Sequence, residues 1–385
     1  MKFPGPPPVG VSPSDPSVAA TPHEADSERP AGSVPSGSVR HTGYLVGFWY
    51  DQIWLIWTPV WVMLVCGLLS FFDLANLEFS HHNGSGLTTR YVFPTLALAV
   101  SMGHVFAVYF RSYLNPTIFP LHRGRFVVVP LLLLFVLLSQ SWLVIPFAVF
   151  ITWFDNWHSA MQTFGLGRLY DQKAGNSAWT GRSLDIGLAI VTFLGPLLAG
   201  VTLVDALHNF EDFSELGWNT LAQVPGFVAY HQPWLSGTIL IGGAGYIAFY
   251  LYSYRQLSHR GYQYPRQKVW LWVALAMTSL LTWGFDSFGQ SFVIMETFHA
   301  LQYFALVWWS EKRNWMRILR VENLFHSENL RRMVSFFLFL GISLFVGAWA
   351  ALYSDTEVEF AFFLVLEFQH YWYDGFVWSV RRRQV

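Results

Sequence analysis

The chain contains little charge and almost no cysteine. Asp, Glu, Lys and Arg make up 12% of its 385 residues, whereas 53% are hydrophobic and 18% aromatic. Soluble globular domains carry about 25% charged residues, so this composition argues against an ordinary soluble protein. The single cysteine, Cys66, excludes an intrachain disulfide framework, thiolate zinc sites and iron–sulfur ligation. A metal ion bound to this chain would therefore need nitrogen and oxygen ligands.

Residues 1–42 lack the apolar segment that a cleavable signal peptide requires. They are rich in Pro, Ser and Gly, and such a composition buries too little apolar surface to fold. We predict a disordered tail here, followed by one polytopic transmembrane domain at 43–385.

Long apolar runs fill the rest of the chain and predict an all-α integral membrane protein. Runs of this kind form helices that cross a bilayer. We expect a bundle of about ten transmembrane helices, near 53–72, 91–110, 126–138, 142–164, 184–207, 234–254, 269–285, 288–309, 333–353 and 358–380. The small residues of IGGAGYIAFY, at 241–250, would allow a neighbouring helix to approach closely.

Lys and Arg gather in alternate connections between these runs, whereas the other connections are acidic or neutral. The basic segments are 122–125, 168–182, 255–268, 312–332 and 381–383. The positive-inside rule then places both termini in the cytoplasm. A basic linker at 310–332 should lie on the cytoplasmic surface among anionic lipids. We expect a multi-pass protein of a bacterial inner membrane.

Three of the apolar runs contain an acidic residue followed three positions later by histidine. The pairs are Asp155 with His158, Glu296 with His299, and Glu367 with His370. Residues at i and i+3 share one face of a helix. Ionisable groups at membrane depth are costly and usually mark a functional site.

A fourth histidine, His104, lies at a similar depth in another run. Counted from the outer ends of their runs, the four histidines lie about 17 to 25 Å into the bilayer, at 1.5 Å per residue. They should therefore form one layer. The three acids lie one turn further out, and the residues that we assign to catalysis lie about one turn further in: Gln162, Gln302 and Asp374.

Imidazole and carboxylate together suit iron, manganese or zinc, and helical bundles build di-iron sites from Glu-x-x-His pairs. We predict two iron ions, with zinc, manganese, copper or haem as alternatives. Haem would use paired histidines on facing helices and would leave the carboxylates unexplained. Acid–histidine pairs that serve only as buried polar packing are a further alternative. The predicted metal ligands are His104, Asp155, His158, Glu296, His299, Glu367 and His370.

In residue types, these ligands and Asp374 resemble the metal centres of polytopic membrane non-haem iron oxygenases and desaturases. The H-x-x-H-H boxes of fatty-acid desaturases are absent, so the resemblance is one of ligand chemistry. It implies O2-dependent oxidation, desaturation or cleavage of a lipid or other hydrophobic substrate. It also implies a cytoplasmic electron-donor protein, and no nucleic-acid partner is expected.

Two other functions are compatible with the same residues. A proton- or ion-coupled transporter or channel could use the acid–histidine layer as a relay or ion site. An intramembrane acyl or glycosyl transferase could use one histidine as a general base.

Overall fold

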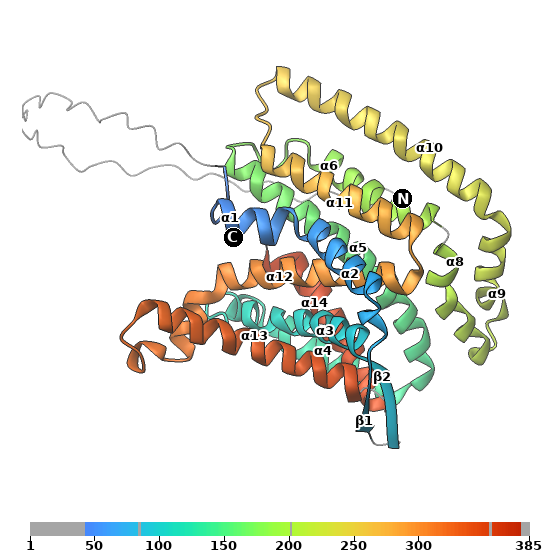
Figure 1. Cartoon of the computed structure of the whole chain (residues 1–385), viewed down its shortest axis with the longest axis horizontal. Helices are drawn as coiled ribbons and strands as arrows, with labels where there is room; N and C mark the ends of the chain where they lie inside the picture. The colour runs from blue at the N-terminus through green and yellow to red at the C-terminus, as the bar shows by residue number, and fades with distance from the viewer. Residues whose placement is uncertain (1–42, 84–85, 201, 354–355, 379–385) are drawn as a thin grey trace, which may run out of the picture. The chain divides into compact units, whose positions relative to one another are not determined.

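The computed structural model describes residues 43–83, 86–200, 202–353 and 356–378, which are predominantly helical (Figure 1). This confirms the all-α prediction, to which the structure adds one short hairpin of strands. The predicted tail at 1–42 and both chain ends lie outside the described residues. Their disorder and their cytoplasmic location therefore remain predictions.

The elements follow one another in three groups along the chain. The first group is α1 (Phe48–Tyr50), the π-helical segment η1 (Asp51–Ile56), α2 (Thr58–Phe71), η2 (Leu74–Asn76), β1 (Glu78–Asn83), β2 (Gly86–Tyr91), α3 (Val92–Arg111), η3 (Phe119–Leu121), α4 (Arg123–Ser139) and η4 (Ser141–Leu143). The second is α5 (Val144–Lys173), α6 (Arg182–Ala189), the π-helical segment η5 (Ile190–Leu194), α7 (Gly195–Ala199), α8 (Leu203–Ala206), η6 (His208–Leu216), α9 (Asn219–Ala222) and α10 (Val224–His259). The third is α11 (Arg266–Phe285), α12 (Phe288–Ile318), η7 (Val321–Asn323), α13 (Glu328–Tyr353) and α14 (Glu357–Val377).

Five of the described helical stretches are long and apolar enough to cross a membrane: α3, α6 to α7, α9 to α10, α11 and α13. Two bent pairs raise this number to seven if each pair forms one span. One pair is α1/η1 with α2, bent by 61°, and the other is α4 with the stretch containing α5, bent by 111°. The helices α5, α12 and α14 do not qualify alone, and these three carry the acid–histidine pairs. The ten-span topology remains a prediction.

Some helices end at different residues from those predicted. Helix α12 continues to Ile318, so the first part of the predicted linker at 310–332 is helical. Helix α10 is longer at both ends than the predicted 234–254. Helical hydrogen bonding continues into polar residues, whereas the predicted limits followed the apolar run alone. Helix α7 ends earlier than predicted, where Gly200 adopts an extended backbone and lies against the backbone of Trp283.

The hairpin of β1 and β2 was not predicted. It is antiparallel, with Glu78 opposite Tyr91 and Asn83 opposite Gly86, and it connects η2 to α3. The last residue of β1 and the residue that follows it in the sequence are Asn83-Gly84, and Asn-Gly is a strong hairpin signal. The signal was missed because the segment is short and its flanking strands are polar.

Two glycines bring the backbones of α3 and α13 into direct contact. A Cβ atom added at Gly347 would lie 1.9 Å from the carbonyl oxygen of Ala99, and one added at Gly103 would lie 2.9 Å from that of Ser343. Only glycine permits this approach. The contact fixes α3 at the residue immediately before His104.

The close packing predicted at 241–250 occurs at Gly243, where an added Cβ would lie 3.4 Å from Cγ1 of Val191 in η5, and it does not occur at Gly242 or Gly245, where an added Cβ would meet no atom within 4 Å. Tyr246 of the same motif also packs against Gly187 of α6 and donates a hydrogen bond of 2.9 Å to the Leu184 carbonyl. A glycine and an aromatic side chain of the motif therefore both contact the preceding helical segments.

Arg168 and Lys268, which the sequence placed in basic connections, are buried in an ion network. The Arg168 guanidinium lies 2.5 Å from Asp171 and 2.7 Å from Asp185, and Lys268 Nζ lies 2.8 and 2.7 Å from the same carboxylates. The hydroxyl of Tyr254 donates to Asp185 at 2.6 Å. This Arg168–Lys268 network joins α5, α6 and α11 and balances two cations against two anions.

A second buried ion pair joins α3, α12 and the end of α14. Arg111 lies 2.6 Å from Glu311, and its guanidinium also donates to the carbonyl of Val377 at 3.2 Å and lies over the Trp378 ring. Asn115 donates to both Glu311 oxygens. Helix α14 also packs against α4 and α5. These contacts hold α3, α5, α12 and α14 around a common interior.

Candidate metal centre

The four histidines predicted to share a layer converge in this interior. They come from α3, α5, α12 and α14, and all four are buried: His104, His158, His299 and His370. Adjacent ring centroids are 4.6 to 5.1 Å apart, and His299 lies 6.4 Å from His370. Side chains from helices distant in sequence therefore form one imidazole cluster.

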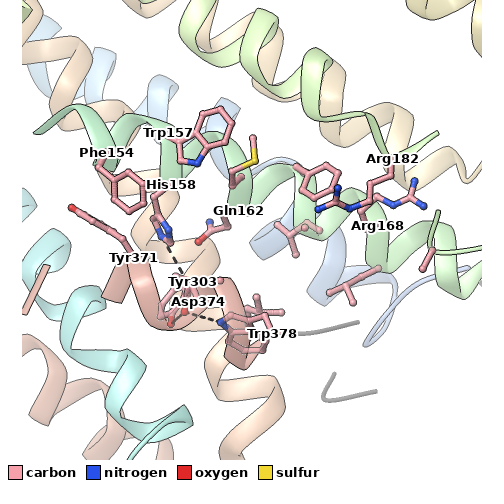
Figure 2. Close-up of a pocket in the computed structure, with 18 residues that line it drawn as sticks. Phe154, Trp157, His158, Gln162, Arg168, Arg182, Tyr303, Tyr371, Asp374 and Trp378 are labelled. Carbon is pink, nitrogen blue, oxygen red and sulfur yellow. Dashed lines mark hydrogen bonds and ion pairs between the residues drawn. The ribbon is translucent and has the colours of Figure 1, made fainter. Parts of the chain in front are cut away.

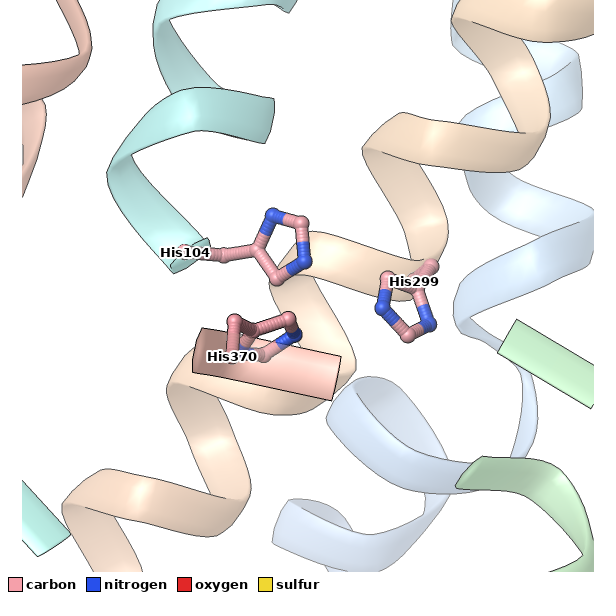
Figure 3. Close-up of side chains that lie close together, drawn as sticks. All are labelled: His104, His299 and His370. Carbon is pink, nitrogen blue, oxygen red and sulfur yellow. The ribbon is translucent and has the colours of Figure 1, made fainter. Parts of the chain in front are cut away.

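Their nitrogen atoms fall into two groups that could hold metal ions. One group is His104, His299 and His370, whose rings turn towards one another in Figure 3. The other is His158, His370 and Asp374. Within each group the ligand atoms lie within 4.8 Å of one another. Nitrogen ligands lie about 2 Å from a bound ion and hence at most about 4 Å apart, so a small contraction would complete either site.

Six imidazole nitrogens of the cluster are buried and have no hydrogen-bond partner in the part of the chain that the structure describes. They are Nε2 of His104, Nε2 of His158, and both nitrogens of His299 and of His370. Each such atom costs about 1–3 kcal/mol when it is left unsatisfied. Metal coordination would satisfy the nitrogens that carry lone pairs, so the donor set fits a metal ion.

The backbone selects the tautomer of His104. Its Nδ1 lies in hydrogen-bonding contact with the carbonyl oxygen of Ser101. A carbonyl oxygen only accepts, so Nδ1 carries the proton and Nε2 keeps its lone pair. Nε2 is therefore free to serve as the ligand atom of His104 in the first group, an arrangement that is typical when a backbone carbonyl orients a ligating imidazole.

The three acids of the acid–histidine pairs form a layer of their own. Asp155 of α5, Glu296 of α12 and Glu367 of α14 are close enough to one another to interact electrostatically. The Ser101 hydroxyl donates to Glu296 at 3.3 Å, and Tyr371 lies beside all three acids. Among the described residues, no Lys or Arg pairs with any of them, so their negative charge needs protons or a bound cation.

These acids do not join the ligand groups found in the described part of the chain. Each acid lies one helical turn from its histidine, so the carboxylate oxygens of the three acids form a layer separate from the imidazole nitrogens. The structure therefore brings together the four predicted histidines and separates the three predicted carboxylates from them. Asp374, which the sequence assigned to catalysis, takes a place among the candidate ligands instead.

The two predicted catalytic glutamines connect backbone segments. Gln162 donates to the His299 carbonyl at 3.1 Å and to the Gln302 side chain at 3.2 Å. Gln302 donates in turn to the Leu55 carbonyl of η1 at 2.8 Å. This chain of hydrogen bonds joins α5, α12 and η1 and supports the histidine layer. Of these two side chains, only Gln162 has a buried atom without a partner, its Oε1.

Asp374 is held by two donors that the sequence analysis did not identify. The Tyr303 hydroxyl and the Trp378 indole both donate to its Oδ1, at 2.8 and 3.0 Å. Its Oδ2 lies 3.8 Å from Nε2 of His158, which is too long for a hydrogen bond. Trp378 follows Asp374 by four residues, so helical spacing would have revealed this donor, whereas Tyr303 lies on α12 and reaches Asp374 of α14 only through the packing of the two helices.

A cavity of about 380 Å³ opens beside the cluster (Figure 2). His158, Asp374, Tyr303 and Tyr371 lie at one end, and Arg168 and Arg182 lie at the other. Apolar side chains form most of the wall between the two ends: Phe154, Trp157, Met161, Phe164, Leu166, Leu169 and Leu306. Small-molecule sites commonly occupy 300–1,000 Å³ and combine an apolar wall with a few polar groups, about as here.

Comparison of the chain with family models, with curated proteins and with solved structures finds no significant match. The case for a function therefore depends on the residues and geometry of the site.

Proposed function

We propose that this chain is an integral membrane oxidoreductase that binds two iron ions at the imidazole cluster and uses O2 to oxidise a lipid-like substrate. The observation that carries the proposal is the set of six buried imidazole nitrogens without hydrogen-bond partners. They belong to four histidines from four helices. Buried polar atoms without partners lower the stability of the folded protein unless a ligand satisfies them.

The surface of the described helices supports a membrane location. Large apolar side chains are exposed on α2, α4, α10 and α13, including Phe71, Phe135, Trp234 and Phe345, which are 68 to 81% exposed. A soluble monomer rarely exposes extended apolar patches. We propose that these helices contact lipid, in the ten-span arrangement with cytoplasmic ends that the alternating Lys and Arg content predicts.

The ligand chemistry supports the proposal of two iron ions. Two ligand groups share His370, and three further carboxyl groups lie one turn away. Imidazole and carboxylate suit iron, manganese and zinc better than calcium or magnesium. Bound iron would supply the activation of O2, while the substrate and a donor protein would each supply an electron pair. The donor would dock on the basic segment at 310–332.

The chain itself would orient the ligands, exclude water and hold protons. The Ser101 carbonyl keeps a proton on Nδ1 of His104, and Tyr303 and Trp378 fix the carboxylate of Asp374. The carboxyl layer of Asp155, Glu296 and Glu367 can hold the protons that reduction of O2 consumes. Burial of all four histidines keeps bulk water from a reactive centre.

Metal analysis of the purified protein tests the proposal. We expect about two iron ions per chain after expression in iron-replete medium, and a loss of iron in each single His→Ala variant of the cluster. His208→Ala is the control, because the His208 side chain is 77% exposed and its Nδ1 lies 3.3 Å from the exposed surface residue Glu211. A parent protein that binds no metal, or four cluster variants that retain all of it, would overturn the metal function.

A proton- or ion-coupled transporter is the second candidate. Titratable groups follow one another through the interior, from the carboxyl layer through the imidazole cluster to Asp374. Two helices near it contain π-helical segments, η1 and η5, and such segments often occur at functional sites. Proton uptake by metal-free protein in liposomes would favour this function over the oxidoreductase.

A further inference from the structure

We propose that the cavity beside the metal centre is a binding site for an amphipathic anion. Its carboxylate or phosphate head would pair with Arg182, and its alkyl chain would extend towards His158 and Asp374. The identity of this molecule as the substrate rests on the proposed function, whereas its binding does not require the metal. The proposal depends on three features: the shape of the cavity, its wall, and the charge at the arginine end.

The cavity has the dimensions of an alkyl chain. Helix α5 contributes both His158 and Arg168 to its lining. Their separation of ten positions corresponds to about 15 Å along the helix at 1.5 Å per residue. A medium-length alkyl chain extends over this distance, and the cavity volume of about 380 Å³ accommodates one.

The wall between the two ends suits hydrocarbon. Trp157, Met161 and Phe164 of α5 line one side, and Leu306 of α12 contributes to the other. Burial of apolar surface contributes about 25 cal/mol per Å². A methionine in such a wall adapts to different chain shapes. The apolar wall therefore favours a chain over a compact polar molecule.

Arg182 is the cation available to the head group. Within the described residues its side chain makes neither a hydrogen bond nor an ion pair, and its guanidinium lies 5.6 Å from the centre of the Phe164 ring. Asp185, one turn further along α6, cannot neutralise it. Both Asp185 oxygens already accept hydrogen bonds, from Arg168, Lys268, Tyr250 and Tyr254.

Arg168 adds a second donor at the same end. Its terminal nitrogens bind Asp171, Asp185 and the carbonyl of Ser177, whereas its Nε is buried without a partner. Because the Arg168–Lys268 network is balanced, Arg182 leaves this end with a net positive charge. Figure 2 shows both arginine side chains at the end of the cavity away from His158. Arginine pairs well with carboxylate and phosphate groups.

Equilibrium binding to metal-free protein in phosphatidylcholine nanodiscs tests the proposal. The probes are radiolabelled dodecanoate, dodecyl phosphate and dodecanol, which share one chain and differ in the head. We expect either anion to bind at least about tenfold more tightly than the alcohol, since a hydrogen bond to a charged group contributes about 1.5–3 kcal/mol. The tighter anion identifies the source of the head: a free fatty acid for the carboxylate, a phospholipid for the phosphate.

Arg182→Gln should weaken anion binding about tenfold and leave dodecanol binding unchanged. The matched control is Arg266→Gln, which removes a positive charge from an exposed residue in the first turn of α11. Met161→Trp should weaken binding of all three probes, because it fills the cavity without altering charge. This variant keeps the test decisive if Arg182→Gln does not fold.

Equal binding of the anions and the alcohol would overturn the proposal, as would equal losses for Arg182→Gln and Arg266→Gln. Anion binding by a protein that never acquires iron would support the cavity proposal and overturn the oxidoreductase. Iron binding without anion binding would support the metal centre and overturn the cavity proposal.

Discussion

Replacing Gly347 with alanine should damage the metal centre although this residue is not a ligand. The added Cβ would lie 1.9 Å from the Ala99 carbonyl oxygen and 2.6 Å from the Gly103 nitrogen. Carbon–oxygen contacts between packed helices are normally no shorter than about 3.3 Å, so α13 and α3 must separate by about 1.5 Å. Overpacking of this kind typically costs about 1–3 kcal/mol.

The same movement would displace His104, which follows Gly103 directly in α3. Metal ligands must be held within about 0.5 Å of their productive positions, and the expected movement is larger. Loss of supporting contacts around a metal site lowers its affinity about 10- to 100-fold. We therefore expect Gly347→Ala to lose both stability and bound iron.

The measurement is iron per chain, together with the midpoint of denaturant unfolding in detergent micelles. Gly341→Ala provides the control within the same helix, because its Cβ would meet nothing within 4 Å. That change should stabilise α13 by up to about 1 kcal/mol through helix propensity. A Gly347→Ala protein with normal iron and normal stability would refute the inferred contact between α3 and α13.

Three further predictions concern the metal itself. Glu296→Gln and Glu367→Gln should lower bound iron while the fold is retained, because each removes a negative charge that offsets the positive charge of ions one helical turn away, and unchanged iron in both variants would show that this charge does not contribute to iron binding. Asp374→Asn keeps an acceptor for Tyr303 and Trp378 but loses a charged ligand, so iron should fall by about half, as the two-site arrangement implies. Chelation of iron-loaded protein should lower its melting temperature, because a ligand at 100 times its Kd contributes about 2.7 kcal/mol. Identical melting before and after chelation would contradict binding to the folded state.

Apolar runs predict where helices lie more reliably than how they are oriented. The run at 91–110 corresponds to α3 and the run at 333–353 to most of α13. Hydropathy contains no information on the direction of a helix axis, so the 111° bend between α4 and the stretch containing α5 was not predictable. Likewise, α12 extends past its apolar run because helical hydrogen bonds form equally well between polar residues.

At the site too, helical spacing predicted contacts within one helix but not contacts between helices. Helical spacing placed three of the four histidines on the faces that carry their acids, because residues at i and i+3 are local neighbours. No spacing rule predicts that Tyr303 meets Asp374, or that Lys268 meets Asp171. These contacts join residues about 70 and 100 positions apart, and they depend on how the helices pack.

The Arg168–Lys268 network also has a consequence for synthesis of the protein. Arg168, Asp171 and Asp185 are made close together, whereas Lys268 follows Asp185 by about 80 residues. At roughly 5–20 residues per second, the interval before Lys268 emerges is about 4–16 s. During that interval the growing chain contains two carboxylates and a single arginine, so one negative charge lacks its partner. Arrival of α11 therefore completes the charge balance, and a chain truncated before this helix should be a substrate for quality-control proteases.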